Sequence, residues 1–190
     1  MDFSSYQTAF RNIIENPAPP APYDNPDYLG YVKLNWSRQQ RWLKTGVISE
    51  PLQTTMRNIH EEQRWIIITE PWCGDAAHIV PFLEKIAALN PRITTTYQLR
   101  DSPPFLIRQY LTNGSKSIPK LIVRNNEGTD LFTWGPRPAG CQLVYDDLKA
   151  TNAGFEQMKT ALQKWYNTDK GVSLQEELLA AIEGAASQAV

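Results

Sequence analysis

The sequence has few of the residues that make disulfides and metal sites. Its 190 residues include two cysteines and two histidines. With no secretory leader in the sequence, thiols are expected to stay reduced, so two cysteines argue against a structural disulfide. His60 and His78 belong to no Cys/His cluster, which leaves a dedicated zinc site without support and predicts that no metal is bound. Each cysteine therefore has to be explained by its own surroundings.

Long apolar runs and clusters of one charge are also missing. The longest apolar runs fall far below the ~18 residues that a membrane span needs. The first residues, 1–5, lack both the basic and the apolar region of a signal peptide. Net charge is −1 and the charges are scattered, which excludes a basic stripe for nucleic acid or a membrane surface. We expect a cytoplasmic protein that binds neither.

What the chain does have is enough apolar residues, 42%, for one domain with extensions. Residues 2–15 show helical spacing, and the proline-rich segment 16–22 cannot continue that helix. Asn25-Pro26 predicts the start of a second helix. We expect residues 1–60 to form a helical extension whose aromatic side chains either pack on the core or form a partner surface, and we favour packing.

The strands follow in the middle of the chain. Short β-branched segments at 65–69 and 93–99 flank a helix that begins beside Cys73. Two more strands, 119–124 and 129–134, are joined by a hairpin signal. The order predicts an α/β domain over 61–168, with a mixed sheet of four or five strands flanked by helices.

A long helix is expected to end that domain, and a C-terminal helix occupies 169–190. The apolar residues predicted to point inward from the long helix are Leu143, Leu148, Phe155, Met158, Leu162 and Trp165.

Cys73 stands where a buried strand gives way to a helix. Free backbone N–H groups and the helix dipole favour an anion at that position, and a cysteine supplies a thiolate. The thiolate is the nucleophile in disulfide exchange. The alternative is a buried structural cysteine, since free cysteine often serves as a small apolar residue.

Trp72-Cys73-Gly74-Asp75-Ala76 resembles the active-site loop Trp-Cys-Gly-Pro-Cys of the thioredoxin family. Pro81 matches the helix-kinking proline, and 117–122 resembles the strand that carries the cis-proline of the family. The resemblance covers about residues 60 to 167. Within the family, the chain most resembles uncharacterised bacterial thioredoxin-like proteins that carry helical extensions. It implies a thioredoxin fold with a cis bond before Pro119. It also implies that the backbone of Ile118 docks an extended substrate.

The sequence departs from the family at three positions. Ala76 replaces the second cysteine, which implies a monothiol mechanism in which an external thiol resolves the mixed disulfide. Asp75 replaces a proline; its position suits the helix dipole, while its charge raises the cysteine pKa. Ile67 stands where the family has a buried carboxylate, and Glu70 is expected to be solvated. We therefore expect Cys73 to be less acidic than the most reactive cysteines of the family.

Two further residues are candidates for the site. Arg137, between two prolines, either aims its guanidinium at a carboxylate of a small thiol or is a solvated surface residue. Cys141 is interpreted as a structural thiol, with a resolving role if the loop moves. His78 lies about 140° around the helix from Cys73, which argues against a Cys–His pair.

The favoured function is a thioredoxin-like thiol-disulfide oxidoreductase that uses Cys73. The resemblance implies that Trp72, Gly74, Asp75, Ile118, Pro119 and Arg137 bind its substrate. Its partners would be protein or small-molecule disulfides, with no cofactor beyond a low-molecular-weight thiol as co-substrate. The alternatives are an inactive binding or adaptor module and, less favoured, an iron–sulfur cluster shared between subunits. The sequence leaves the oligomeric state open.

Overall fold

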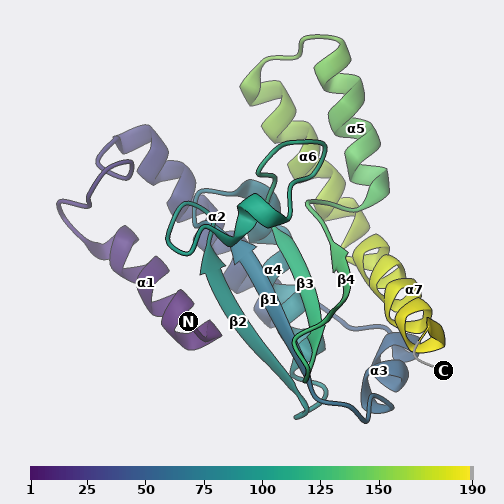
Figure 1. Cartoon of the computed structure of the whole chain (residues 1–190). Helices are drawn as coiled ribbons and strands as arrows, with labels where there is room; N and C mark the ends of the chain where they lie inside the picture. The colour runs from purple at the N-terminus through teal and green to yellow at the C-terminus, as the bar shows by residue number, and fades with distance from the viewer. Residues whose placement is uncertain (189–190) are drawn as a thin grey trace.

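The structure, a computed structural model, describes residues 1–188 of the chain. Its elements are drawn in Figure 1 and run in the order α1 (Phe3–Glu15), α2 (Pro26–Thr45), α3 (Glu50–Arg57), β1 (Gln63–Thr69), α4 (Gly74–Ala87), β2 (Ile93–Leu99), the 3₁₀ helix η1 (Leu106–Gln109), β3 (Lys120–Asn125), β4 (Asp130–Trp134), α5 (Ala139–Ala150), α6 (Phe155–Asp169) and α7 (Val172–Gln188).

The four described strands form one mixed sheet in the order β2-β1-β3-β4. β1 pairs with β2 in parallel and with β3 antiparallel, and β3 and β4 form the predicted antiparallel hairpin. Ile67 and Ile68 in the central strand β1 are fully buried, as expected for a strand covered on both faces. The predicted mixed sheet flanked by helices is confirmed.

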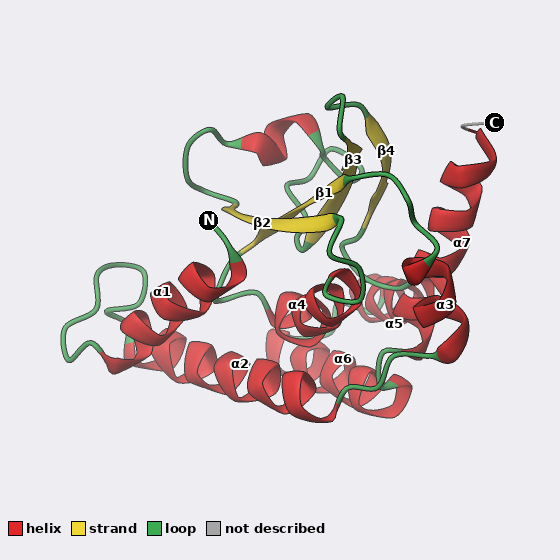
Figure 2. Ribbon diagram, turned by 90° about the horizontal axis from the view of Figure 1, so that it is seen from below, coloured by secondary structure: helices red, strands yellow, loops and turns green. Residues whose placement is uncertain are grey.

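The helices are distributed unevenly about the sheet. Figure 2 shows α4 directly beneath one face, with α2 and α6 in a layer beyond it, while the loop that carries η1 crosses the other face. α2 and α4 pack extensively against each other. The start of α4 therefore lies between the sheet and the outer helices, and Cys73 stands there, at the end of the loop that follows β1.

The helix starts follow from capping chemistry. Asp2 accepts a hydrogen bond from the Ser5 amide (2.7 Å) at the start of α1, and Asn25 accepts from the amides of Asp27 and Tyr28 at the start of α2. The N-cap of α4 is Cys73 itself. The sulfur therefore takes the place that an oxygen usually occupies at this position.

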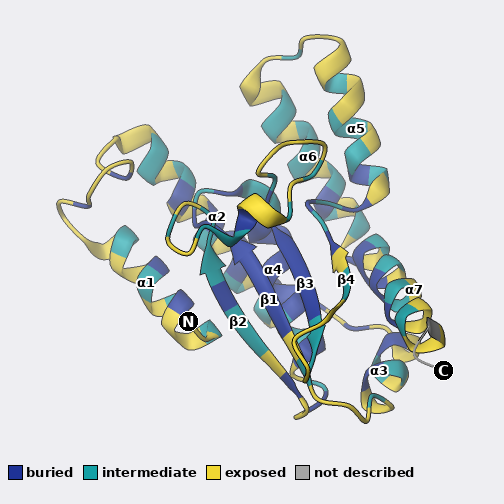
Figure 3. Ribbon diagram, in the orientation of Figure 1, coloured by how far each residue is buried: buried dark blue, intermediate teal, exposed yellow. Residues whose placement is uncertain are grey.

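The first helices bury their aromatic faces against the core. Tyr6, Phe10 and Val32 are buried, and Tyr6 stacks on Tyr97 of β2 with ring centroids 5.1 Å apart. Figure 3 shows the inner sides of α1 and α2 buried and their outer sides exposed. Burial of this kind is the main stabilising contribution in a domain of this size.

The single long helix predicted after residue 140 is wrong. The segment forms two helices, α5 and α6, separated by residues 151–154. Asn152 adopts φ 53°, and the Ala153 amide bonds back to Leu148, which ends α5. Leu143 and Phe155 are therefore exposed instead of pointing inward.

Within residues 1–188, no helix combines the length and apolar character needed to cross a membrane.

Candidate functional site

The sulfur of Cys73 lies between two backbone groups from different elements. The amide of Ala76, in the first turn of α4, donates to Sγ at 3.4 Å. The thiol in turn donates to the carbonyl oxygen of Ile118 at 3.3 Å. The Ile118–Pro119 bond is cis, as predicted, and it lies just before β3. The sequence-predicted contact between the cysteine and this peptide is therefore present.

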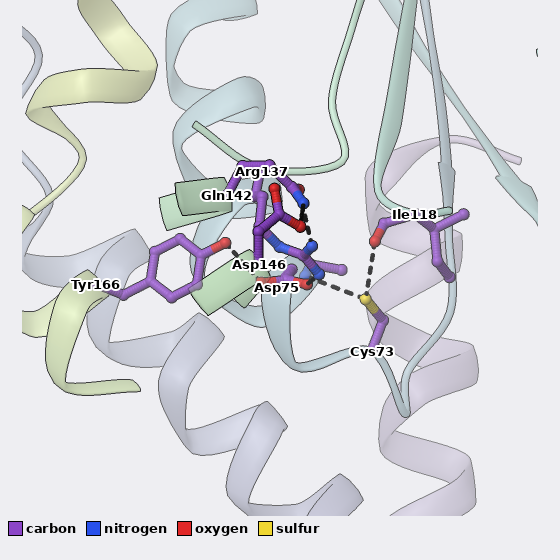
Figure 4. Close-up of polar contacts among 8 residues, drawn as sticks. Cys73, Asp75, Ile118, Arg137, Gln142, Asp146 and Tyr166 are labelled. Carbon is purple, nitrogen blue, oxygen red and sulfur yellow. Dashed lines mark hydrogen bonds and ion pairs between the residues drawn. The ribbon is translucent and has the colours of Figure 1, made fainter. Parts of the chain in front are cut away.

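A buried polar network lies on the other side of the Cys73 loop, as Figure 4 shows. Asp75 pairs with Arg137 through Oδ2 and Nη2 at 2.5 Å and accepts from the Tyr166 hydroxyl at 2.7 Å. Arg137 also donates to Gln142, which donates to Asp146. The network joins the start of α4 to the loop before α5 and to α6.

The charge on Asp75 and the burial of the sulfur act together on Cys73. Burial, followed by the negative charge of Asp75, raises the pKa of the Cys73 thiol from 9.0 to about 12. The amides of Ala76 and Asp75 and the guanidinium of Arg137 act in the opposite direction. The thiol form therefore predominates at neutral pH, a stronger departure from the reactive cysteines of the family than the sequence predicted.

His78 packs against this network through Tyr166. Its Nδ1 accepts from Trp42 Nε1 at 2.9 Å, and its ring stacks on Tyr166 with centroids 4.5 Å apart. Burial, followed by the positive charges of Arg38 and Arg41, lowers the pKa of His78 to about 3. The imidazole is therefore neutral at physiological pH, and its hydrogen bond runs to Trp42 rather than to Cys73.

A surface cavity of about 870 Å³ opens beside the sulfur. Six of the seven predicted site residues line it, and the seventh, Pro119, is buried behind Ile118. The lining residues from the predicted set are Trp72, Cys73, Gly74, Asp75, Ile118 and Arg137. The volume falls in the range of small-molecule sites. Cys73 is a buried residue, with 7% of its surface exposed, and it forms part of the cavity wall.

One sequence expectation at this site is wrong, and one of the two alternatives for Arg137 is excluded. Glu70 is not solvated: it is 6% exposed, its carboxylate accepts from the Asp101 amide at 3.1 Å, and burial raises its pKa. Of the two alternatives for Arg137, the solvated surface residue is excluded, because the side chain pairs with Asp75 and is only 12% exposed. Its role in substrate binding stays a prediction. Burial, the largest single effect, lowers the pKa of Arg137, but the charge and hydrogen bond of Asp75 together with Tyr166 and Cys141 outweigh it and raise the pKa.

The remaining predicted residues take supporting places. Trp72 lies under the guanidinium of Arg100, with 4.5 Å from Cζ to the ring centroid. Cys141 is a free thiol with no exposed surface, and burial raises its pKa to about 12. Ile67, where the family has a carboxylate, is fully buried. Across residues 1–188 no group of three or more His, Cys, Asp or Glu side chains is arranged to hold a metal ion.

Sequence reasoning missed the contribution of the outer helices to this cavity. Tyr31 and Arg38 of α2 line it, and so do Lys159 and Tyr166 of α6. The signal that could have found Arg38 is its position on the buried face of α2, four residues before Trp42 and three after Asn35. Tyr166 had no such signal, because its role depends on the unpredicted break between α5 and α6.

Comparisons with known proteins agree with the fold. A family model described as Thioredoxin matches residues 23–149, so the match includes α2 and α3 as well as the sheet. A crystal structure of a protein of unknown function from Pseudomonas aeruginosa is similar, with a TM-score of 0.59, 19% identity and coverage of 97% of this chain and 92% of that one. An HIV epitope scaffold has a TM-score of 0.55, 20% identity and coverage of 97% and 99%. A search of curated proteins finds no match.

Proposed function

The chain belongs to the thioredoxin family, and we propose that it is a thiol-disulfide oxidoreductase that acts through the single sulfur of Cys73. The observation that carries the proposal is the position of Sγ, held by the Ala76 amide and the Ile118 carbonyl at the edge of a cavity. A cysteine at a helix N-terminus beside an open cavity is placed to attack a disulfide that enters there.

The reaction needs one sulfur from the protein and one external thiol. The Cys73 thiolate attacks a disulfide R–S–S–R′, the S–S bond breaks, and R′–S⁻ leaves and takes a proton. The product is a mixed disulfide between Cys73 and R. An external thiolate R″–S⁻ then attacks the sulfur of R, which releases R–S–S–R″ and restores Cys73. Ala76 carries no thiol that could do this from within the chain.

The high thiol pKa slows the first step but does not exclude it. At neutral pH only a small fraction of Cys73 is thiolate, because its pKa is raised to about 12. A thiolate of high pKa is intrinsically more nucleophilic, with a Brønsted coefficient of about 0.4–0.5, so part of the loss is recovered. We expect a slow enzyme whose rate rises with pH.

Mass spectrometry of the intact protein tests the proposal. After treatment with the neutral disulfide of mercaptoethanol, we expect one adduct on the wild-type protein and on Cys141→Ser, and none on Cys73→Ser. Addition of a free thiol should remove the adduct. A wild-type protein in which Cys73 remains unmodified would rule the mechanism out.

An adaptor without redox chemistry is the second candidate. The replacement of the second cysteine by Ala76, the buried Ile67 and the raised pKa of Cys73 favour it. An adaptor would bind an extended segment beside Ile118 by backbone pairing, and the sulfur would not react. Peptide binding that survives in Cys73→Ser, together with an unreactive wild-type Cys73, would favour this function over the first.

A further inference from the structure

Arg38 is a buried cation for which the described residues provide no carboxylate. It lies on α2 and is 4% exposed. Nη1 donates to Asn35 at 2.8 Å and Nη2 donates to Gln163, both neutral amide side chains. Nε is buried without a hydrogen-bond partner. No Asp or Glu of residues 1–188 forms an ion pair with it.

A guanidinium in this position needs an anion. Charged side chains are seldom fully buried unless they are paired, because removing the charge from water is costly. Arg38 lines the same cavity as Cys73, so a ligand there is able to reach it. The charged residues of the cavity wall are Arg38, Arg100, Lys116, Arg137 and Lys159 against Asp27, Asp75 and Glu156. Arg100, Arg137 and Lys159 each pair with a carboxylate, Lys159 with Glu156 at 2.6 Å, whereas Arg38 pairs with none among the described residues.

Tyr31 connects this cation to the reactive sulfur. The guanidinium of Arg38 and the ammonium of Lys159 lie 5.5 and 5.4 Å from the centroid of its ring. Its hydroxyl lies against Gly74, where an added Cβ would be only 2.2 Å away. Gly74 directly follows Cys73. An anion held by Arg38 therefore lies beside the tyrosine whose hydroxyl contacts the Cys73 loop.

From this geometry we propose an anion-binding subsite centred on Arg38 beside Tyr31, with Lys159 adding positive charge at its edge. Its ligand is a carboxylate of an acidic low-molecular-weight disulfide whose sulfur reacts with Cys73. A planar guanidinium with fixed donors matches the geometry of a carboxylate. The inference rests on the proposed function, and it assigns α2, outside the resemblance found in the sequence, to substrate selection.

Disulfides of similar size and different charge test the subsite. The probes are dithiodipropionate, which is anionic, hydroxyethyl disulfide, which is neutral, and cystamine, which is cationic. The measurement is the rate of Cys73 adduct formation by mass spectrometry at constant ionic strength. We expect the anionic probe to react about tenfold faster than the neutral one, and the cationic probe to react most slowly. Arg38→Gln should reduce the ratio of anionic to neutral rates to about one.

Two further variants separate the subsite from general effects. Lys159→Gln should reduce the same ratio in part, which keeps the test valid if Arg38→Gln folds poorly. Lys33→Gln removes an exposed charge from α2 away from the cavity and should leave the ratio unchanged. Equal rates for all three probes on the wild-type protein would overturn the subsite while the proposed function stands.

A binding measurement keeps the two claims apart if no probe reacts. Cys73→Ser cannot form the adduct, so dithiodipropionate becomes a simple ligand whose affinity calorimetry measures. Binding that is lost in Cys73→Ser/Arg38→Gln supports the anion site even where the redox function fails. Absence of binding to Cys73→Ser overturns the site.

Discussion

At Cys73, burial and a neighbouring carboxylate outweigh the backbone amides that favour a thiolate. The same sulfur accepts from Ala76 and donates to Ile118, and only the protonated form does both. The thiol is thus part of the local hydrogen bonding around the α4 N-terminus. Loss of its proton removes the bond to Ile118 and leaves the bond to Ala76.

Alkylation of Cys73 by iodoacetamide should therefore continue to accelerate up to at least pH 10, without a plateau near pH 7. Asp75→Asn removes the second-largest cause of the raised pKa and should speed alkylation at pH 8 by up to about tenfold, since one pKa unit changes the thiolate fraction tenfold. Asp27→Asn, at another carboxylate of the cavity wall, is the matched control. Equal rates in Asp75→Asn and wild type would contradict this account.

His78 should make the fold sensitive to acid. Its folded pKa, about 3, lies below its ordinary value of 6.5, so the unfolded state binds the extra proton between these values. The stability that the neutral ring provides is complete above pH 6.5 and is lost as the pH falls toward 3. Below pH 6 the contribution of His78 to the change in the free energy of unfolding with pH approaches about 1.4 kcal/mol per pH unit.

His78→Gln, which keeps an acceptor for Trp42, tests this dependence. Urea unfolding followed between pH 7 and pH 5 should give a smaller loss of stability for the variant than for the wild type. The charged and polar groups that act on the ring, Arg38, Arg41 and Tyr166, are the same in both proteins. Parallel curves would mean that His78 does not carry the effect.

Among the elements, α4 and α6 are joined through the Asp75–Arg137–Tyr166 network. Arg137 and Asp75 side chains are only 12% and 10% exposed, so this pair is not a surface salt bridge. Replacing one member of the pair by a neutral side chain leaves the other charge buried without a partner, which lowers the free energy of unfolding more than replacing both members does.

Arg137→Met should therefore lower the free energy of unfolding by about 3–5 kcal/mol. The double variant Arg137→Met/Asp75→Asn should recover part of that loss. Guanidinium denaturation of the two single variants and the double variant gives the coupling energy. A double variant whose loss equals the sum of the two single losses would show that the pair is not coupled.

The junction of α6 and α7 depends on a glycine. Gly171 has φ +81°, and an added Cβ would lie 2.5 Å from the ring of Phe82 in α4. Gly171→Ala should destabilise the protein by about 2–4 kcal/mol, from the positive φ and the clash together. Gly30→Ala, in an exposed part of α2 with nothing within 4 Å, should instead stabilise it by about 0.5–1 kcal/mol. Thermal unfolding of both variants checks the opposite signs.

Over the whole molecule, the first helices and the sheet share one core. Tyr6 of α1 stacks on Tyr97 and accepts from Gln39, so it joins three elements. Tyr6→Ala should cost about 3–5 kcal/mol, as is typical for a large buried aromatic residue. Thr8→Ala, on the exposed side of α1, should have little effect.

Thermal unfolding followed by circular dichroism and by tryptophan fluorescence distinguishes one shared core from two independent ones. We expect their transitions to coincide in wild type and to shift together in Tyr6→Ala. Two separate transitions would mean that α1 and α2 unfold independently of the sheet.

The sequence predicted the sheet well, because alternating strands and a helix at Cys73 are local signals. It also predicted the contact between Cys73 and the Ile118–Pro119 peptide, although only through the family resemblance. It did not predict the ion pair of Asp75 with Arg137, nor the burial of Glu70. These depend on which distant segments meet, and neither periodicity nor spacing contains that information.

Ala76 has one further consequence for the proposed reaction. A captured thiol would stay on the protein until a second molecule collides with the mixed disulfide, so its dwell time varies inversely with the concentration of that molecule. In a relative with a second cysteine in this turn, that cysteine would resolve the mixed disulfide at a rate independent of any external thiol. One methyl group in the first turn of α4 thus ties the lifetime of the modified state to the composition of the surrounding solution.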